Sequence, residues 1–162
     1  ITDIKLLEYI RDNYNGHVIF STGMSTIEEI KEAAKIFDYN NITVMLCNSS
    51  YPSVDEELDL RALELLKQEL NIGEENMSRL GYSGHEKDIL PTIMAKTLGA
   101  EVIERHITLD KGMWGTDQFA SLEPKELKVL INSLNRIDVI LGNSDITVYP
   151  SEEKIKKKLR RK

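Results

Sequence analysis

The hydrophobic residues of this chain follow two patterns, short apolar runs and helical spacing, and the two patterns alternate several times along the sequence. Short runs of β-branched and other apolar residues each end in small polar residues or a histidine. Each run is followed by a stretch in which apolar residues recur at helical spacing. Such a succession is typical of strands and helices that take turns along the chain. The pattern predicts strands at 17–23, 42–50, 77–83 and 100–108.

The predicted helices have recognisable ends. Ser25 and Glu28 have the spacing of a capping box. Gly99 and Gly142 stand just after two amphipathic stretches, where a helix commonly ends. Pro91 must lie in the first turn of its helix or kink it. We expect helices over 1–14, 27–37, 55–70, 86–98 and 123–141.

One helix followed by four strand–helix units predicts an α/β fold with parallel strands and right-handed crossovers. Four such strands make either a small open sheet or half of a (βα)8 barrel, and in both cases functional residues gather at the carboxyl ends of the strands. We predict a partial barrel domain over 1–150. The basic segment 151–162 is interpreted as a frayed helix or the start of a linker, rather than an arm that binds nucleic acid.

Composition and charge narrow the function classes. The net charge of −6 argues against general nucleic-acid binding, and no apolar run approaches the roughly 20 residues that span a bilayer. The single cysteine, Cys47, excludes an internal disulfide and favours a reducing, cytoplasmic location. It lies within an apolar strand, so we expect a small buried residue rather than a nucleophile. The chain begins with Ile1, so we expect a piece of a longer or processed product.

Two histidines follow consecutive predicted strands. Since side chains alternate along a strand, Ser83 and His85 share one face, and Glu104 and His106 share one face. On adjacent strands, the two imidazoles would meet above one rim. Two neutral imidazoles can bind a divalent metal ion and leave other coordination positions of the ion open for a substrate oxygen. A hydrogen-bonded structural role is the alternative for each, and the third histidine, His17, is expected to be structural or solvated at the opposite end.

Other polar residues near the predicted rim have two possible roles. Asp110 and Asp117 are either solvated or capping residues, or a glycine-containing loop folds one of them over the rim. Serines close three predicted strands and could cap the next helix or bind an anion at its amino terminus. These serines are Ser21, Ser49 and Ser83.

Four segments of the chain match a family pattern in the right order: "STGMSTIEEI", "CNSSYPS", "LGYSGHE" and "LGAEVIERHITLDKGMWGTDQFASLEPKEL". They resemble the second half of the sialic acid synthase family, which includes N-acetylneuraminate, legionaminic and pseudaminic acid synthases. The resemblance extends from about residue 5 to about residue 141. It implies that the four predicted strands are strands five to eight of a (βα)8 barrel. A homo-oligomer or a partner chain would then complete the barrel.

The resemblance also implies a reaction and a set of site residues. The family condenses phosphoenolpyruvate with N-acetylmannosamine or a related N-acetylhexosamine and releases phosphate, using a divalent metal such as Mn²⁺, with Mg²⁺ as the alternative. By motif, His85 and His106 resemble the metal ligands and, with Asp117, the catalytic set. The expected phosphoenolpyruvate contacts are Ser21, Ser49 and Ser83, and the expected sugar contacts are Tyr51 and Asp117.

The sequence departs from the family pattern close to both histidines. Gly84 stands where the family usually has Asp, Glu86 where it often has Thr, Asn48 where it has Thr, and Arg105 where it has Lys. Gly84 removes a carboxylate that could orient His85.

Two other functions are kept as alternatives. The first four barrel strands, with the family's lysines for phosphoenolpyruvate, lie outside this sequence. A non-catalytic half-barrel that self-associates or binds metal or sugar phosphate is therefore the first alternative. The second is another phosphoenolpyruvate- or metal-dependent aldol-type barrel, such as the related deoxy-sugar acid synthases, which the distinctive "IERHITLD" block favours less.

Overall fold

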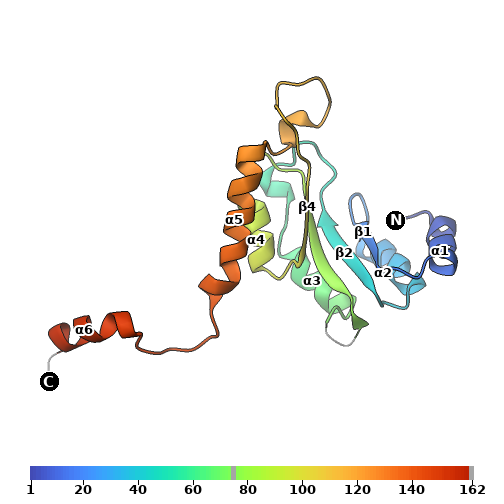
Figure 1. Cartoon of the computed structure of the whole chain (residues 1–162). Coiled ribbons are helices and arrows are strands. Elements are labelled where there is room, and N and C mark those ends of the chain that lie inside the picture. Colours follow the sequence, from blue (N-terminus) through green and yellow to red (C-terminus); the bar gives the residue numbers. More distant parts are fainter. Residues whose placement is uncertain (74–75, 161–162) are drawn as a thin grey trace.

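A sheet of four parallel strands forms the centre of the protein (Figure 1). The computed structural model describes residues 1–73 and 76–160. Strands that follow one another in the sequence are neighbours in the sheet, so the order is β1-β2-β3-β4 and the sheet has the form of a half-barrel. The strands are β1 (Val18–Ser21), β2 (Ile42–Cys47), β3 (Arg79–Gly84) and β4 (Val102–Arg105). The predicted α/β class with parallel strands is confirmed.

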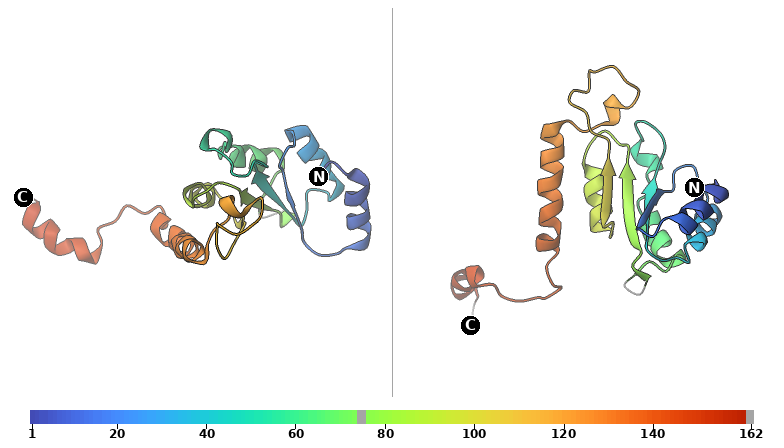
Figure 2. Two further views of the ribbon diagram at one scale, coloured as in Figure 1. Left: turned by 90° about the horizontal axis from the view of Figure 1, so that it is seen from above. Right: turned by 45° about the vertical axis from the view of Figure 1, so that its right-hand side comes forward.

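Helices cover one face of this sheet, and a longer helix packs outside them (Figure 2). Helices α3 and α4 contact β2 and β3, and α5 packs against α4. The helices are α1 (Ile4–Asn13), α2 (Ile27–Ile36), α3 (Ala62–Glu69), α4 (Leu90–Thr97), α5 (Pro124–Leu141) and α6 (Pro150–Leu159), with 3₁₀ turns η1 (Asp55–Glu57) and η3 (Gln118–Ala120). The opposite face of the sheet carries polar residues such as Ser83 and Glu104 together with apolar ones such as Ile19 and Met45.

The core lies between the sheet and its helices. Alternate strand residues such as Phe20, Val44 and Leu80 point toward helical residues such as Ile30 and Leu63, and all of these side chains are buried. Removing this apolar area from water is the main favourable contribution to folding. Because successive side chains alternate, the residues between them point to the other face, where the candidate site lies.

The predicted helix over 55–70 is wrong in its first half. Residues Asp55–Glu57 form only a 3₁₀ turn, and Asp59 has a left-handed backbone with φ of 38°. The α-helix therefore begins at Ala62. The periodic leucines of this stretch predicted a continuous helix, but periodicity does not report a local turn that interrupts it.

The predicted capping box lies one residue too early. The helix begins at Ile27, and its cap is Thr26, whose hydroxyl accepts from the Glu29 amide at 3.3 Å while the Glu29 carboxylate accepts from the Thr26 amide at 2.7 Å. Ser25 instead donates to a loop carbonyl. Both residues carry a hydroxyl, so sequence spacing alone did not separate them.

The helix ends predicted from Pro91, Gly99 and Gly142 are confirmed, whereas the helix predicted over 86–98 begins only at Leu90. Pro91 lies in the first turn of α4, where its missing amide hydrogen costs nothing. Gly99 and Gly142 follow α4 and α5 with φ of 103° and 63°, values that L side chains rarely adopt.

Helix α6 stands apart from the sheet at the end of an extended connection (Figure 1). It has no buried residue. The assignment of 151–162 to a separate unit stays a prediction. Residues 161–162 lie outside the described residues. Within the described part of the chain, every helix is too short or too polar to cross a membrane.

Candidate functional site

The two predicted metal-binding histidines meet at the carboxyl end of the sheet. His85 and His106 each come one residue after the end of a strand, β3 and β4 respectively. Their ring centroids are 5.2 Å apart and the ring planes are nearly perpendicular, at 88°. One layer below, the Ser83 hydroxyl donates to the Glu104 carboxylate at 2.7 Å, which shows that these side chains share the face. The predicted convergence of the two imidazoles is confirmed.

His85 is held in one orientation. Its Nδ1 lies 2.6 Å from the Asn48 carbonyl oxygen, which can only accept, so in the neutral ring Nδ1 carries the proton and Nε2 has the lone pair. The Tyr51 hydroxyl lies 3.1 Å from Nε2 and donates to it, and the Tyr51 ring stacks on the imidazole with centroids 4.1 Å apart. A backbone carbonyl therefore orients this histidine, although Gly84 supplies no carboxylate.

His106 is more open and faces an acidic loop. Its side chain is 34% exposed, and its Nδ1 lies 3.9 Å from the Asp117 carboxylate, beyond hydrogen-bond length but close enough for attraction when the ring is protonated. The loop between β4 and α5 thus folds Asp117 over the rim, as one of the two interpretations expected. Asp110 instead accepts from the Gly112 amide at 2.6 Å, which makes it a turn residue.

The expected phosphoenolpyruvate contacts are not equally close to the histidines. Ser49 and Ser83 lie beside the thiol of Cys47, whose sulfur is 3.9 Å from His85 Nδ1. Ser21 lies at the exposed end of β1, in register with Met45 of β2. Among the described residues, the Ser21 side chain makes no hydrogen bond. The site therefore gathers Ser49, Ser83, Tyr51 and Asp117 around the histidine pair, and Ser21 marks its outer edge.

The alternative role of these serines as helix caps is wrong. The residues that precede α2, α3 and α4 are Thr26, Arg61 and Ile89. None of the three strand-end serines therefore caps a helix, and Ser83 donates to Glu104 instead.

Cys47 is not activated. Burial raises the pKa of its thiol, and the neighbouring hydroxyls of Ser83 and Ser49 offset this only partly. The nearest ring nitrogen, His85 Nδ1, already carries a proton and cannot act as a base toward the sulfur. Cys47 is only partly buried, so the predicted burial is not met in full, but its environment is not that of an activated nucleophile.

One candidate functional residue was missed. Glu104 lies on the same face as His106, and its carboxylate is exposed but fixed by the Ser83 hydroxyl. The alternation that located His106 also placed Glu104 on this face, so the signal was present. His17 hydrogen-bonds Asn41 and Thr43 at the amino end of β1, at 2.9 and 2.7 Å, as its predicted structural role requires.

His85 and His106 can supply two of the ligands of a divalent metal ion, but not a complete coordination sphere. Within residues 1–73 and 76–160, no group of three or more His, Cys, Asp or Glu side chains is placed to hold a metal. His85 nevertheless presents the Nε2 lone pair that a metal requires, with its other nitrogen bonded to an orienting carbonyl. Two imidazoles leave further positions for water or substrate oxygen, as open metal sites do.

A family model covers nearly the whole chain. Residues 1–146 match the NeuB family. The chain belongs to this family.

The named relatives are synthases of nonulosonic acids. The chain is 38% identical over 159 residues to N,N'-diacetyllegionaminic acid synthase of Campylobacter jejuni, covering 95% of this chain and 46% of that protein. It is 37% identical over 145 residues to human N-acetylneuraminate-9-phosphate synthase, covering 88% and 39% respectively. The chain therefore spans less than half the length of these relatives.

Solved structures agree with this assignment. The N-acetylneuraminic acid synthetase of Leptospira borgpetersenii, crystallised with citrate, superposes with a TM-score of 0.78 at 35% identity. The match covers 98% of this chain and 55% of that one. A spore coat polysaccharide biosynthesis protein of Bacillus subtilis superposes with a TM-score of 0.77 at 27% identity, covering 94% and 46%.

Proposed function

We propose that this NeuB-family chain is the carboxyl-terminal half of a (βα)8 barrel and carries the metal-binding side of a nonulosonic acid synthase. The observation that carries the proposal is the convergence of His85 and His106, with ring centroids 5.2 Å apart, at the carboxyl end of the sheet. This is the end where barrel enzymes place their active sites. The names of the synthases that share more than a third of its residues point to the same chemistry.

The proposed reaction joins phosphoenolpyruvate to N-acetylmannosamine or a related N-acetylhexosamine. The vinyl carbon of phosphoenolpyruvate attacks the sugar aldehyde, water adds to the neighbouring carbon, and phosphate leaves. A divalent ion, Mn²⁺ or Mg²⁺, would polarise the aldehyde when bound. Within this chain, His85 and His106 would hold the ion, the former through Nε2.

The remaining residues of the site would bind and orient the two substrates. Ser49 offers a hydroxyl donor to the anionic groups of phosphoenolpyruvate, and Ser83 would do so by exchanging its hydrogen bond to Glu104 for one to the substrate. Ser21 lies further out. Tyr51 and Asp117 flank the histidine pair from two loops and would contact the sugar. Asp117 can also attract a proton on His106, which lies 3.9 Å away.

Metal binding is tested directly with the chain itself. Mn²⁺ is titrated calorimetrically into the wild-type chain and into His85→Ala, His106→Ala and His17→Ala variants. We expect binding in the wild type, its loss in the first two variants, and no change in the third, since His17 lies at the other end of the sheet. Binding that survives both rim substitutions would refute the metal assignment.

Catalysis is tested in the full product of the gene that encodes these residues. The protein is incubated with phosphoenolpyruvate, Mn²⁺ and each of several N-acetylhexosamines, and phosphate release and product mass are followed. We expect phosphate release that depends on one sugar. If phosphoenolpyruvate is consumed equally with sugars that lack the N-acetyl group, the related deoxy-sugar acid synthases become the better assignment.

The open edges of the sheet favour a second candidate function. Within the described residues, β1 and β4 each pair on one side only, so the isolated half-barrel exposes two rows of backbone groups. A non-catalytic module that closes against a second copy or another chain would satisfy both edges. This candidate predicts metal binding without turnover in any complex that the chain forms. Homo-oligomerisation and a cytoplasmic location stay predictions.

A further inference from the structure

The strand ladder does not fix the distance between the two histidines. The last paired residues of β3 and β4 are Gly84 and Arg105, so His85 and His106 both lie just past the end of the ladder. The His85 carbonyl accepts from the Ser53 amide at 3.0 Å, and the His106 carbonyl accepts from the Leu122 amide at 2.8 Å. Each histidine carbonyl is thus tied to a different loop. At the rim, the Tyr51 ring lies beside both imidazoles, with centroids 4.1 Å from that of His85 and 5.3 Å from that of His106.

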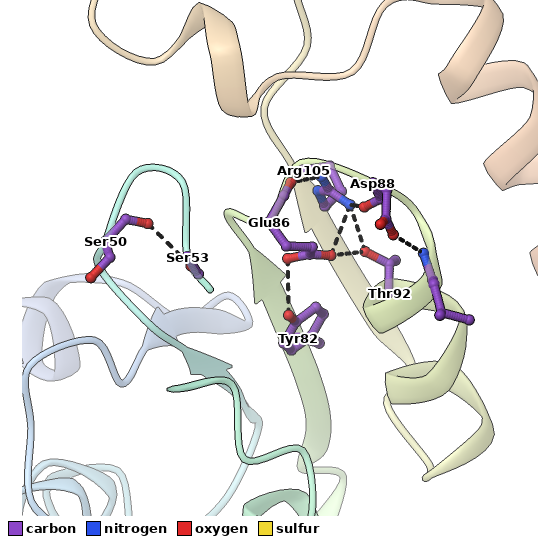
Figure 3. Close-up of polar contacts among 8 residues, drawn as sticks. Ser50, Ser53, Tyr82, Glu86, Asp88, Thr92 and Arg105 are labelled. Atoms are coloured by element: carbon purple, nitrogen blue, oxygen red, sulfur yellow. Dashed lines mark hydrogen bonds and ion pairs between the residues drawn. The ribbon is translucent and has the colours of Figure 1, made fainter. Parts of the chain in front are cut away.

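Directly beneath the rim, the sequence neighbours of the two histidines form a buried ion pair (Figure 3). Glu86 follows His85 and Arg105 precedes His106, so alternation sends both side chains to the helix-covered face. Their charged atoms are 2.9 Å apart, and each side chain is only 2% exposed. This pair joins the two chain segments at the level where the ladder stops.

The guanidinium of Arg105 grips the segment that follows β3 at several points. One terminal nitrogen donates to the Glu86 carboxylate at 2.9 Å and to the Asp88 carbonyl at 2.9 Å. The other donates to the Glu86 carbonyl at 2.6 Å. Since both the backbone and the side chain of Glu86 are held, the residue after His85 has little freedom to move away from β4.

The carboxylate of Glu86 is also anchored from its other side. It accepts from the Tyr82 hydroxyl at 3.0 Å and from the Thr92 hydroxyl at 2.7 Å, on β3 and α4 respectively. Burial and the neighbouring carboxylate raise the pKa of Tyr82, which keeps its hydroxyl protonated as a donor. Both oxygens of the Glu86 carboxylate thus have partners, whereas Arg105 Nε is buried without one among the described residues. Removing either charge of the pair alone would leave the other buried and unpaired, which is strongly unfavourable.

Gly84 completes the arrangement by leaving space. A methyl group at this position would lie 2.6 and 2.8 Å from the two carboxylate oxygens of Glu86. The carboxylate therefore occupies the volume that a side chain at position 84 would need. Gly84, Glu86 and Arg105, the three departures around the histidines, depend on one another in space.

We infer that Glu86 and Arg105 are positioning residues, which act as a clamp that sets the separation and orientation of His85 and His106 for joint metal binding. Neither side chain reaches the rim itself, so the pair acts through the backbone of the two histidines. The metal-binding part of this inference rests on the proposed function, whereas the geometric part does not. The alternative is that the pair contributes only to stability.

The test uses a double variant that removes both charges together. Glu86→Gln keeps an acceptor for Tyr82 and Thr92, and Arg105→Met keeps the unbranched apolar stem of the side chain while removing the guanidinium, so no charge is left unpaired. Arg105→Lys is the milder second variant, since one ammonium cannot reproduce the contacts of both guanidinium nitrogens. Leu66→Ala, on the buried face of α3, is the control for lost stability without a broken clamp.

Two readouts separate positioning from stability. The nuclear Overhauser effect between the ring protons of His85 and His106 reports their separation without any metal. Calorimetric titration with Mn²⁺ reports joint binding. In the folded double variant we expect the ring–ring signal to weaken and the Mn²⁺ dissociation constant to rise about 10- to 100-fold, the range for residues that orient metal ligands. The Leu66→Ala variant should keep both wild-type values.

Each outcome decides between the two interpretations. An unchanged ring–ring signal and affinity in the folded double variant overturn the inference. If the double variant does not fold, wild-type values in Arg105→Lys overturn it, and an intermediate loss supports it. If the wild-type chain binds no Mn²⁺, the proposed metal site fails, and the ring–ring signal alone then decides whether the clamp positions the histidines.

Discussion

At the scale of single residues, Tyr51 occupies the lone pair that the proposed metal needs. Its hydroxyl donates to His85 Nε2 at 3.1 Å, and the same nitrogen cannot bind a metal ion at the same time. Tyr51→Phe keeps the stacked ring and removes this competitor. Because a hydrogen bond contributes about 0.5–1.5 kcal/mol net, we expect Mn²⁺ to bind roughly 2- to 10-fold more tightly. The measurement is calorimetric titration, and weaker binding would instead make the hydroxyl a supporting group.

Gly84 permits a second prediction at this scale. Gly84→Ala places a methyl group against the Glu86 carboxylate and the Tyr82 ring, which lies 2.8 Å from it. Overpacking of this kind costs about 1–3 kcal/mol of unfolding free energy. Gly84→Ala should cost less unfolding free energy in a Glu86→Ala background, where the carboxylate no longer fills this volume. Glu86→Ala is itself costly, because it leaves Arg105 unpaired.

Urea unfolding of the two single variants and the double variant measures this dependence. We expect the costs to be non-additive by roughly 0.5–3 kcal/mol, as for residues in contact. Simple additivity would mean that the two positions do not share their space, and the close approach to Gly84 would then have no consequence.

The sequence predicted the meeting of the histidines but not what holds them. Strict alternation along two short strands was enough to place His85 and His106 on one face. The orienting group of His85 is the carbonyl of Asn48, and a backbone atom leaves no trace in residue identity. Glu86 and Arg105 were visible only as departures from a family pattern, since their pairing depends on a register that the sequence does not state.

At the scale of elements, the loop that carries Asp117 is tied to the start of α5. The Lys111 ammonium lies 2.7 Å from the Glu126 carboxylate, and the Lys111 amide donates to Glu123 at 3.0 Å. Glu126 also accepts from the Glu123 amide at 2.9 Å, which closes the helix cap. One carboxylate thus connects loop and helix.

Glu126→Gln should loosen this loop. The pair is partly exposed, so its contribution is at most about 1 kcal/mol, which corresponds to no more than roughly a fivefold change in a local opening equilibrium. We expect faster chymotryptic cleavage after Trp114 and Phe119 in the variant, followed by mass spectrometry. Lys96→Met is the matched control, since it removes the Lys96–Asp138 ion pair between α4 and α5. Equal acceleration by the control would assign the effect to general destabilisation.

The contact between Lys111 and Glu126 should stabilise the loop in a pH-dependent way. The Lys111 ammonium and the Glu123 amide lower the pKa of Glu126 below its usual range. A carboxylate with a lowered pKa stabilises the folded state above its unfolded pKa of about 4.3, and this stability is lost as the pH falls through the folded pKa. The cleavage rate of the wild-type loop should therefore rise to that of the Glu126→Gln loop only in acid. An acid-tolerant protease is needed for this measurement.

Sequence patterns were reliable for elements wherever a residue has one conformational role. Pro91 and Gly142 mark a helix start and a helix end because few other positions accept them. The stretch 55–70 failed because Asp59 adopts a left-handed backbone, which aspartate tolerates but does not signal. The cap at Thr26 was misplaced because its neighbour offers the same hydroxyl.

At the scale of the whole molecule, the four-stranded sheet has two edges that a closed barrel does not have. A closed barrel pairs every strand on both sides, whereas this sheet ends at β1 and β4. Ile19 of β1 is 53% exposed on the face away from the helices, so an apolar side chain lies beside an unpaired edge. Such an edge is a template for pairing with a further strand.

We therefore expect the chain to associate in a concentration-dependent way, and we expect the β1 edge to take part. Ile19→Lys puts a charge beside that edge, which is how natural sheets block edge pairing. Sedimentation velocity over a range of concentrations should show the variant shifted toward monomer relative to the wild-type chain. Val139→Lys, on an 82% exposed site of α5, adds the same charge away from both edges and should leave association unchanged. A wild-type chain that stays monomeric at every concentration would show that its edges are protected in solution, and closure against a second copy would then be excluded as a function of this half-barrel.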